Sequence, residues 1–187
     1  MLSALVAGGL VRAGARDGGG AGIIVMGATA LCAVLFLCME VVAVLQGVQA
    51  REAVSATFRN LPDGFRCSGR VRVTGWGRRP VLVDQVVVTP EGEAYAVVVD
   101  GSTRPPAAGD PLDGVGALIP AARRAAEAVA AAAAARVLGG VPLPPGVRVD
   151  PCIVVARRPI TPGRRAGVFT VAAGDFAHAI PPAVAGR

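Results

Sequence analysis

The pattern of apolar and polar positions divides the chain into an N-terminal membrane-type segment and a mixed domain. Residues 21–39 (AGIIVMGATALCAVLFLCM) carry no charge, and a helix of 19 residues is about long enough to cross a bilayer core. Apolar character continues beyond Glu40, so we expect one transmembrane helix over residues 21–48, preceded by an arm of residues 1–20. A carboxylate at mid-bilayer costs about 2.5 kcal/mol or more, which places Glu40 at a head-group boundary or in a helix–helix contact.

A cleavable signal peptide is the alternative interpretation of this segment. Arg12 and Arg16 resemble the basic region of such a peptide, and the small residue Ala50 resembles the residue before a cleavage site. However, the apolar run is longer than usual for a signal peptide, and Glu40 and Gln46 lie between the run and the site. A retained anchor is therefore the favoured prediction.

Arginines that flank the span predict its orientation. The N-terminal side offers Arg12 and Arg16, whereas the C-terminal side offers Arg51, Arg59 and Arg66. Because basic residues are enriched on the cytoplasmic side, we expect a single-pass protein of the cell membrane with a cytoplasmic C-terminal domain. A domain outside the cytoplasm, anchored or secreted by the same segment, is the alternative.

Beyond the span, the pattern predicts one α/β domain over residues 49–182, followed by a tail of residues 183–187. Strands are indicated by period-2 alternation or by short runs that are apolar on both faces, and helices by propensity and by Pro/Gly punctuation. The expected elements are a helix from Val48 to Asn60, strands Cys67–Thr74, Val81–Thr89 and Ala94–Asp100, a helix Ile119–Leu138, strands Cys152–Ala156 and Val168–Ala172, and a short helix Phe176–Ile180.

Composition narrows the possible chemistry. Hydrophobic residues make up 53% of the chain and aromatic residues only 4%, so a disordered polar protein is excluded and the core must be built from Val, Ala and Leu. All 19 basic residues are arginines, which excludes any reaction that needs a lysine ammonium.

Paired arginines suggest a surface for polyanions. Such a surface attracts nucleic-acid phosphates or anionic lipid head groups, although arginines can equally serve as solubilising charge. The candidates for nucleic-acid binding are Arg78, Arg79, Arg157, Arg158, Arg164 and Arg165.

Two aspartates are the candidates for chemistry. Asp84 interrupts an apolar strand, so it needs a hydrogen-bond partner, an arginine or a metal, and Asp100 ends the next strand. If opposite residues of this hairpin have numbers that sum to 184, the two aspartates share a face; a slip of one residue separates them. Convergent carboxylates would suit Mg²⁺. In the alternative interpretation, Asp84 lies at an edge and Asp100 only opens a turn.

Cysteine and histidine offer no clear catalytic group. Cys67 and Cys152 each fall near the start of an expected strand and could pair only if those strands were neighbours, so we expect two reduced cysteines. His178 is the only histidine and is expected at the surface.

Three segments carry a resemblance to a known family. Leu61–Phe65 (LPDGF), Val83–Gly92 (VDQVVVTPEG) and Tyr95–Asp100 (YAVVVD) resemble the nuclease-related domain, NERD, of the PD-(D/E)XK restriction-endonuclease-like group. The likeness extends over about residues 50–180. It implies a restriction-endonuclease-like mixed sheet flanked by helices, and metal-dependent cleavage of phosphodiester bonds. Membrane-anchored forms of this domain are familiar in bacteria.

The resemblance also implies which residues would act, and the chain departs from it at four positions. The family places acids at Asp84 and Asp100 and a lysine two residues later, where this chain has Ser102. Its histidine after the first acid corresponds to Gln85. Its helix glutamate falls on Arg51, with Glu52 one position out of register. Its glutamine at the later helix has no counterpart, since the corresponding stretch offers Gly114.

These departures predict a degenerate site. We therefore expect a membrane-anchored NERD-like domain with a binding or scaffolding role, involving nucleic acid or anionic lipid, with no cofactor and with an unknown protein partner. The alternative is a weak metal-dependent nuclease, in which Asp84, Asp100 and Glu52 would hold Mg²⁺.

Overall fold

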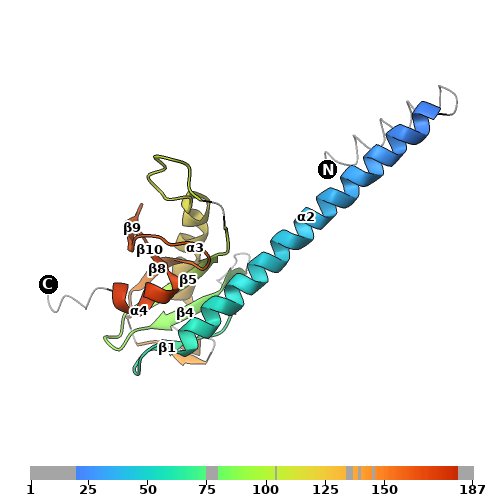
Figure 1. Ribbon diagram of the computed structural model, residues 1–187. Coiled ribbons are helices and arrows are strands. Elements are labelled where there is room, and N and C mark those ends of the chain that lie inside the picture. Colours follow the sequence, from blue (N-terminus) through green and yellow to red (C-terminus); the bar gives the residue numbers. More distant parts are fainter. Residues whose placement is uncertain are drawn as a thin grey trace. The chain divides into compact units, whose positions relative to one another are not determined.

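The computed structural model describes residues 20–74, 80–103, 105–133, 137–138, 140–144 and 146–180, with side chains from residue 26 onward and not at residue 137. The chain divides between Leu45 and Gln46 into two units, which are described separately. One helix, α2, contributes to both units because it runs without a break from Gly20 to Arg59 (Figure 1).

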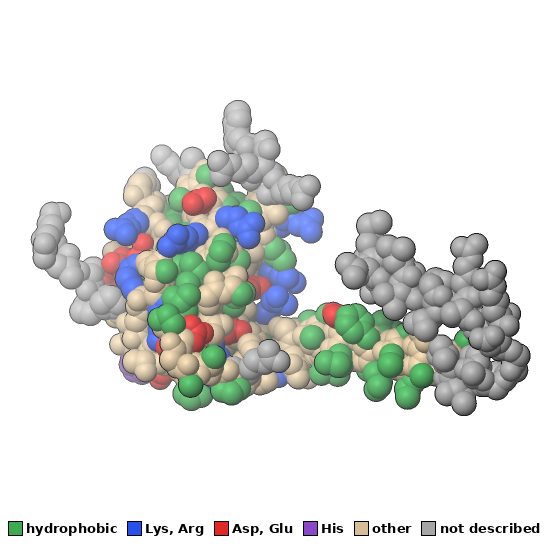
Figure 2. Space-filling model, turned by 90° about the horizontal axis from the view of Figure 1, so that it is seen from above, with side chains coloured by type: hydrophobic (Ala, Val, Ile, Leu, Met, Phe, Trp, Pro, Cys, Tyr) green, Lys and Arg blue, Asp and Glu red, His purple; other side chains and the backbone are tan. Residues whose placement is uncertain are grey.

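The first part of α2 has an apolar exposed surface. Large apolar side chains from Met26 to Val48 are exposed, and they cover the described part of this helix in Figure 2. The helix is long and apolar enough to cross a membrane, as the sequence predicts. Glu40 is exposed within this stretch.

The last part of α2 packs on the domain. Ala50, Val54 and Phe58 recur every four residues on one helix face, and all three are buried in the core. The helix ends just before Leu61-Pro62, as predicted, because proline cannot continue the hydrogen-bond pattern.

A mixed sheet of six strands forms the centre of the domain, in the order β1-β4-β5-β8-β10-β9. The parallel pairs are β5 with β8 and β8 with β10, and the other neighbouring pairs are antiparallel. The strands are β1 (Arg66–Cys67), β4 (Gln85–Val88), β5 (Ala94–Asp100), β8 (Val149–Val155), β9 (Gly163–Arg165) and β10 (Val168–Ala172). The predicted mixed α/β class is confirmed; the restriction-endonuclease-like arrangement stays a prediction.

Two expected strands are each divided in the structure. The expected strand Val81–Thr89 bends at Asp84, so that β3 (Val81–Val83) leaves the main sheet and pairs with β2 (Val71–Val73) in a separate two-stranded sheet. The expected strand Cys67–Thr74 is correspondingly divided into β1 and β2. Apolar and polar residues alternate through the break between β1 and β2, and valines stand on both sides of Asp84-Gln85 at the other break, which is why the sequence pattern predicts a single strand in each case.

Helices cover both faces of the sheet (Figure 1). On one face, α3 (Ile119–Ala132), which follows a 3₁₀ turn η1 (Gly116–Leu118), buries Ala125 and Val129 against β4 and β5. On the other face, the end of α2 and the short helix α4 (Phe176–Ala179), preceded by the 3₁₀ turn η3 (Ala173–Asp175), enclose an aromatic cluster. Its ring centroids lie 4.6 Å apart between Phe58 and Phe176, and 6.1 Å apart between Tyr95 and Phe176.

The predicted extent of α3 is wrong at its C-terminal end. Instead of continuing to Leu138, the chain forms a two-stranded sheet of β6 (Val137–Leu138) and β7 (Val141–Pro142). Leu138 and Val141 are both buried in the same core as α3, so burial of these apolar side chains outweighs helix propensity here.

Gly101, just after β5, allows α2 to dock closely. A Cβ atom at Gly101 would lie 2.9 Å from the Cβ atom of Ala50, closer than packed atoms approach. We expect Gly101→Ala to lower the free energy of unfolding by about 2 kcal/mol through overpacking, as measured by urea unfolding of the full chain in detergent.

The matched control is Gly69→Ala, since nothing lies within 4 Å of a Cβ atom there. The double variant Gly101→Ala/Ala50→Gly should be more stable than Gly101→Ala, because its remaining cost is mainly helix propensity, about 1 kcal/mol. Equal stability of the Gly101→Ala and Gly69→Ala variants would contradict this close packing.

Candidate functional site

Asp84, at the bend between β3 and β4, has donors on both carboxylate oxygens. Its Oδ1 accepts a hydrogen bond from Arg51 Nε at 2.9 Å, and Arg70 Nε lies 3.8 Å from the same oxygen. Its Oδ2 accepts a bond from the backbone N–H of Val99 at 3.0 Å. The side chain is only 11% exposed. Of the partners that the sequence allows for this carboxylate, the structure therefore shows arginine.

Both arginines reach Asp84 because of local geometry. Arg51 follows the buried Ala50 on α2, so its side chain leaves the helix at the flank of the packed face. Arg70 precedes β2, and since Val71 pairs with Val83, the antiparallel register continues to Arg70 opposite Asp84. Opposite charges at such directly opposed positions attract.

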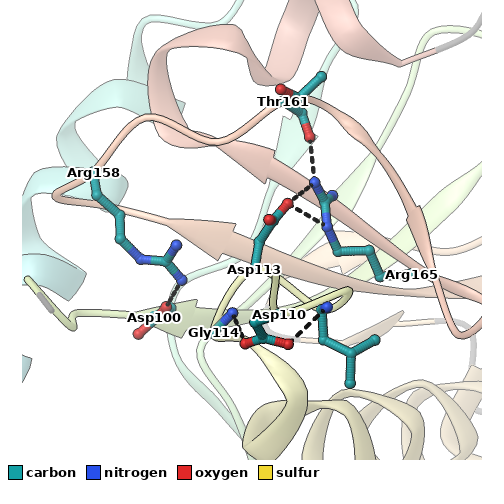
Figure 3. Close-up of polar contacts among 8 residues, drawn as sticks. Asp100, Asp110, Asp113, Gly114, Arg158, Thr161 and Arg165 are labelled. Carbon is teal, nitrogen blue, oxygen red and sulfur yellow. Dashed lines mark hydrogen bonds and ion pairs between the residues drawn. The ribbon is translucent and has the colours of Figure 1, made fainter. Parts of the chain in front are cut away.

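Asp100, the last residue of β5, forms a buried ion pair. Its Oδ2 accepts a hydrogen bond from a terminal nitrogen of Arg158 at 3.1 Å, and these two side chains are only 7% and 8% exposed. Its Oδ1 accepts a bond from the backbone N–H of Ser102 at 2.9 Å. Arg158 also packs against Gly114, where an added Cβ atom would lie 3.4 Å from the guanidinium. Figure 3 shows Arg158 pointing toward Asp100.

The two aspartates are not directly opposite each other. The hairpin pairs Gln85 with Val97 and Val88 with Ala94, so opposite residue numbers sum to 182 and not to 184. Asp84 and Asp100 instead have separate arginine partners, and Glu52 is exposed on α2. Within the described residues, no three His, Cys, Asp or Glu side chains form a group that could hold a metal ion. This donor set does not fit a divalent cation.

Gln85, where the resemblance to NERD implies a histidine, lies inside the domain. It is buried, and its Nε2 donates a hydrogen bond to Ser55 Oγ of α2 at 2.6 Å. Its Oε1 has no partner within the described structure. Gln85 therefore ties β4 to α2, next to the Arg51–Asp84 pair.

The arginines expected to bind nucleic acid are largely engaged within the domain. Arg78 and Arg79 lie outside the described residues. Each of the four described members donates a hydrogen bond within the domain: Arg157 to Gln49, Arg158 to Asp100, Arg164 to Asp150 and Arg165 to Asp113. The Arg165 side chain is only 12% exposed, and the hydrogen bond to Asp150 raises the pKa of Arg164. These pairings join segments far apart in the sequence, which is why sequence reasoning missed them.

The loop before η1 is ordered by its own aspartates (Figure 3). Asp110 accepts hydrogen bonds from the backbone N–H groups of Leu112 at 2.9 Å and Gly114 at 2.7 Å. Asp113 has a positive φ of 49° and pairs with Arg165, which also donates to the carbonyl oxygen of Thr161 at 3.0 Å. The sequence signal for this turn was Asp110-Pro-Leu-Asp-Gly, since aspartate side chains commonly accept bonds from the backbone two residues later.

The cysteines and the histidine agree with the predictions. Cys67 in β1 and Cys152 in β8 are both free, and β4 and β5 separate their strands. Burial raises the pKa of Cys67 to about 11 and also raises that of Cys152, so neither thiol is activated at neutral pH. His178 is exposed beside an open pocket of about 330 Å³ between α2 and α4, and neither Asp84 nor Asp100 lines this pocket.

The fold and the site define an α/β domain with a mixed sheet and a long apolar N-terminal helix, in which two aspartates near the ends of β4 and β5 are paired with arginines. Comparisons with family models, with curated proteins and with solved structures found no match for this chain. The resemblance to NERD therefore depends on the three sequence segments alone.

Proposed function

We propose that this protein is a membrane-anchored, NERD-like domain that binds or scaffolds a partner and does not cleave nucleic acid. The observation that carries this proposal is the pairing of both family-position aspartates with arginines, Asp84 with Arg51 and Asp100 with Arg158.

Cleavage of a phosphodiester by this family's chemistry needs a divalent cation that is held by carboxylates and activates water. A guanidinium 2.9 Å from Asp84 neutralises that carboxylate and repels a second cation. Asp100 is similarly neutralised by Arg158. Ser102, at the position of the family lysine, carries no charge to stabilise the transition state. Two carboxylates of the expected machinery are therefore neutralised and its lysine is replaced, and each of these changes opposes cleavage.

The exposed apolar surface of α2 supports a retained membrane anchor. Ala50, the residue before the alternative cleavage site, is completely buried inside a continuous helix. Cleavage there would separate the span from a helix turn that packs in the core. We further propose that the domain faces the cytoplasm, as the arginines after the span predict.

A membrane surface or a protein is a better candidate partner than nucleic acid. The described members of the expected nucleic-acid set are bonded to groups of the domain, and Arg158 and Arg165 are mostly buried. Phosphate contacts by Arg158, Arg164 or Arg165 would require these three arginines to leave carboxylates that they already neutralise.

A cleavage assay tests this proposal. The full chain in detergent, incubated with plasmid and short single-stranded DNA in the presence of Mg²⁺ or Mn²⁺, should cleave no more than buffer does. Asp84→Ala should behave identically, because the wild-type chain has no activity to lose. Metal-dependent cleavage by the wild-type chain that Asp84→Ala abolishes would instead support the nuclease alternative.

A further inference from the structure

Three arginines from distant parts of the sequence lie around α2 at the level of Gln49–Arg51. Arg51 belongs to α2 itself, and Arg70, which precedes β2, lies beside it at their shared partner Asp84. Arg157, which follows β8, donates a hydrogen bond to Gln49 Oε1 at 2.8 Å. We call Arg51, Arg70 and Arg157 the juxtamembrane arginines.

The juxtamembrane arginines lie just beyond the end of the exposed apolar surface of α2. Val48 is the last large apolar residue of α2 that is exposed, at 43%. Arg51 comes three residues later, which is only about 5 Å further along a helix axis. A helix that is buried in lipid up to Val48 brings these arginines to the level of the head groups.

The charges of this cluster are only partly compensated. Arg51 and Arg70 share one carboxylate, and Arg157 bonds a neutral amide. Glu52, exposed on α2, adds one more negative charge, but three arginines still outnumber the carboxylates of Asp84 and Glu52. The side chains of Arg51 and Arg70 are 40% and 52% exposed, so they retain N–H groups that can bind another acceptor.

We propose that the juxtamembrane arginines bind the phosphate groups of anionic lipids. This inference rests on the proposed membrane anchor and adds a specific lipid contact to it. Guanidinium groups match phosphate oxygens in pairs, and each arginine near a bilayer surface strengthens binding to anionic lipid. Lipid is favoured over nucleic acid because Arg51 follows Val48, the last exposed large apolar residue of α2, by only three residues.

The test measures partition of the full chain from detergent into vesicles by flotation. Vesicles of phosphatidylcholine alone are compared with vesicles that also contain phosphatidylglycerol. The wild-type chain should enter both but prefer the anionic vesicles, and salt should weaken this preference. In Arg70→Gln/Arg157→Gln, the preference should fall by about fivefold for each arginine removed. Arg51 is left in place because it holds Asp84.

The matched control is Arg124→Gln/Arg148→Gln, which removes the same charge from two exposed arginines on α3 and near β8. It should keep the wild-type preference. Equal loss in both double variants, or no preference in the wild-type chain, would overturn the lipid contact while leaving the anchor intact. Failure to enter either vesicle would overturn the anchor and the contact together. If the first double variant instead lost only binding to a DNA oligonucleotide, the cluster would be assigned to nucleic acid.

Discussion

Replacement of Arg158 by methionine is expected to lower the free energy of unfolding by about 3–5 kcal/mol. Arg158 and Asp100 are both more than nine-tenths buried, so removal of the guanidinium leaves a carboxylate without its opposite charge inside the domain. Urea unfolding of the full chain in detergent, followed by circular dichroism, measures this loss.

Two further variants separate a charge effect from a packing effect. The double variant Arg158→Met/Asp100→Asn should regain part of the lost stability, because the unpaired charge is also removed. Arg148→Met removes an arginine that is 86% exposed from its pair with Asp150, and should cost less than about 1 kcal/mol. A loss at Arg158 as small as that at Arg148 would contradict the assignment of a buried ion pair.

Replacement of Arg51 by glutamate is expected to create a divalent-cation site. Glutamate Oε lies as many bonds from Cα as arginine Nε, so its carboxylate can occupy the position now 2.9 Å from Asp84 Oδ1. Without metal, the two adjacent carboxylates should lower the free energy of unfolding by about 1–3 kcal/mol. Mg²⁺ should then restore about 1.4 kcal/mol at ten times its dissociation constant, measured by thermal unfolding.

The wild-type chain and Arg51→Gln serve as controls, and neither should be stabilised by Mg²⁺. Arg51→Glu/Asp84→Asn should lose the metal response, since one of the two carboxylates is then neutral. Equal stabilisation of the wild-type chain by Mg²⁺ would show that Arg51 does not take the place of a cation.

Much of the sheet could be predicted from the sequence because its strands are short apolar runs. The range of β5, Ala94–Asp100, and that of β10, Val168–Ala172, are as predicted. The break at Asp84 could not be predicted, since there Asp84 pairs with Arg70, which precedes β2, and with Arg51 of α2. The early end of α3 likewise depends on the burial of Leu138, which an alanine-rich helix pattern does not reveal.

The candidate site could be predicted only in part for the same reason. Asp84 stood out because a carboxylate inside an apolar strand needs a partner, and the sequence left arginine and metal as alternatives. Only the fold brings Arg51, 33 positions away, and Arg158, 58 positions from Asp100, to the two carboxylates. No sequence spacing encodes contacts of this kind, because they arise from the packing of α2 and from the loop after β8.

The most direct test is whether arginines take the place of a divalent cation at Asp84 and Asp100. The full wild-type chain is titrated with Mn²⁺, and electron paramagnetic resonance reports the free aqueous ion. We predict that the free-ion signal follows that of buffer and is unchanged by Asp84→Ala. Stoichiometric loss of the signal that Asp84→Ala restores would show that the carboxylates hold a metal after all.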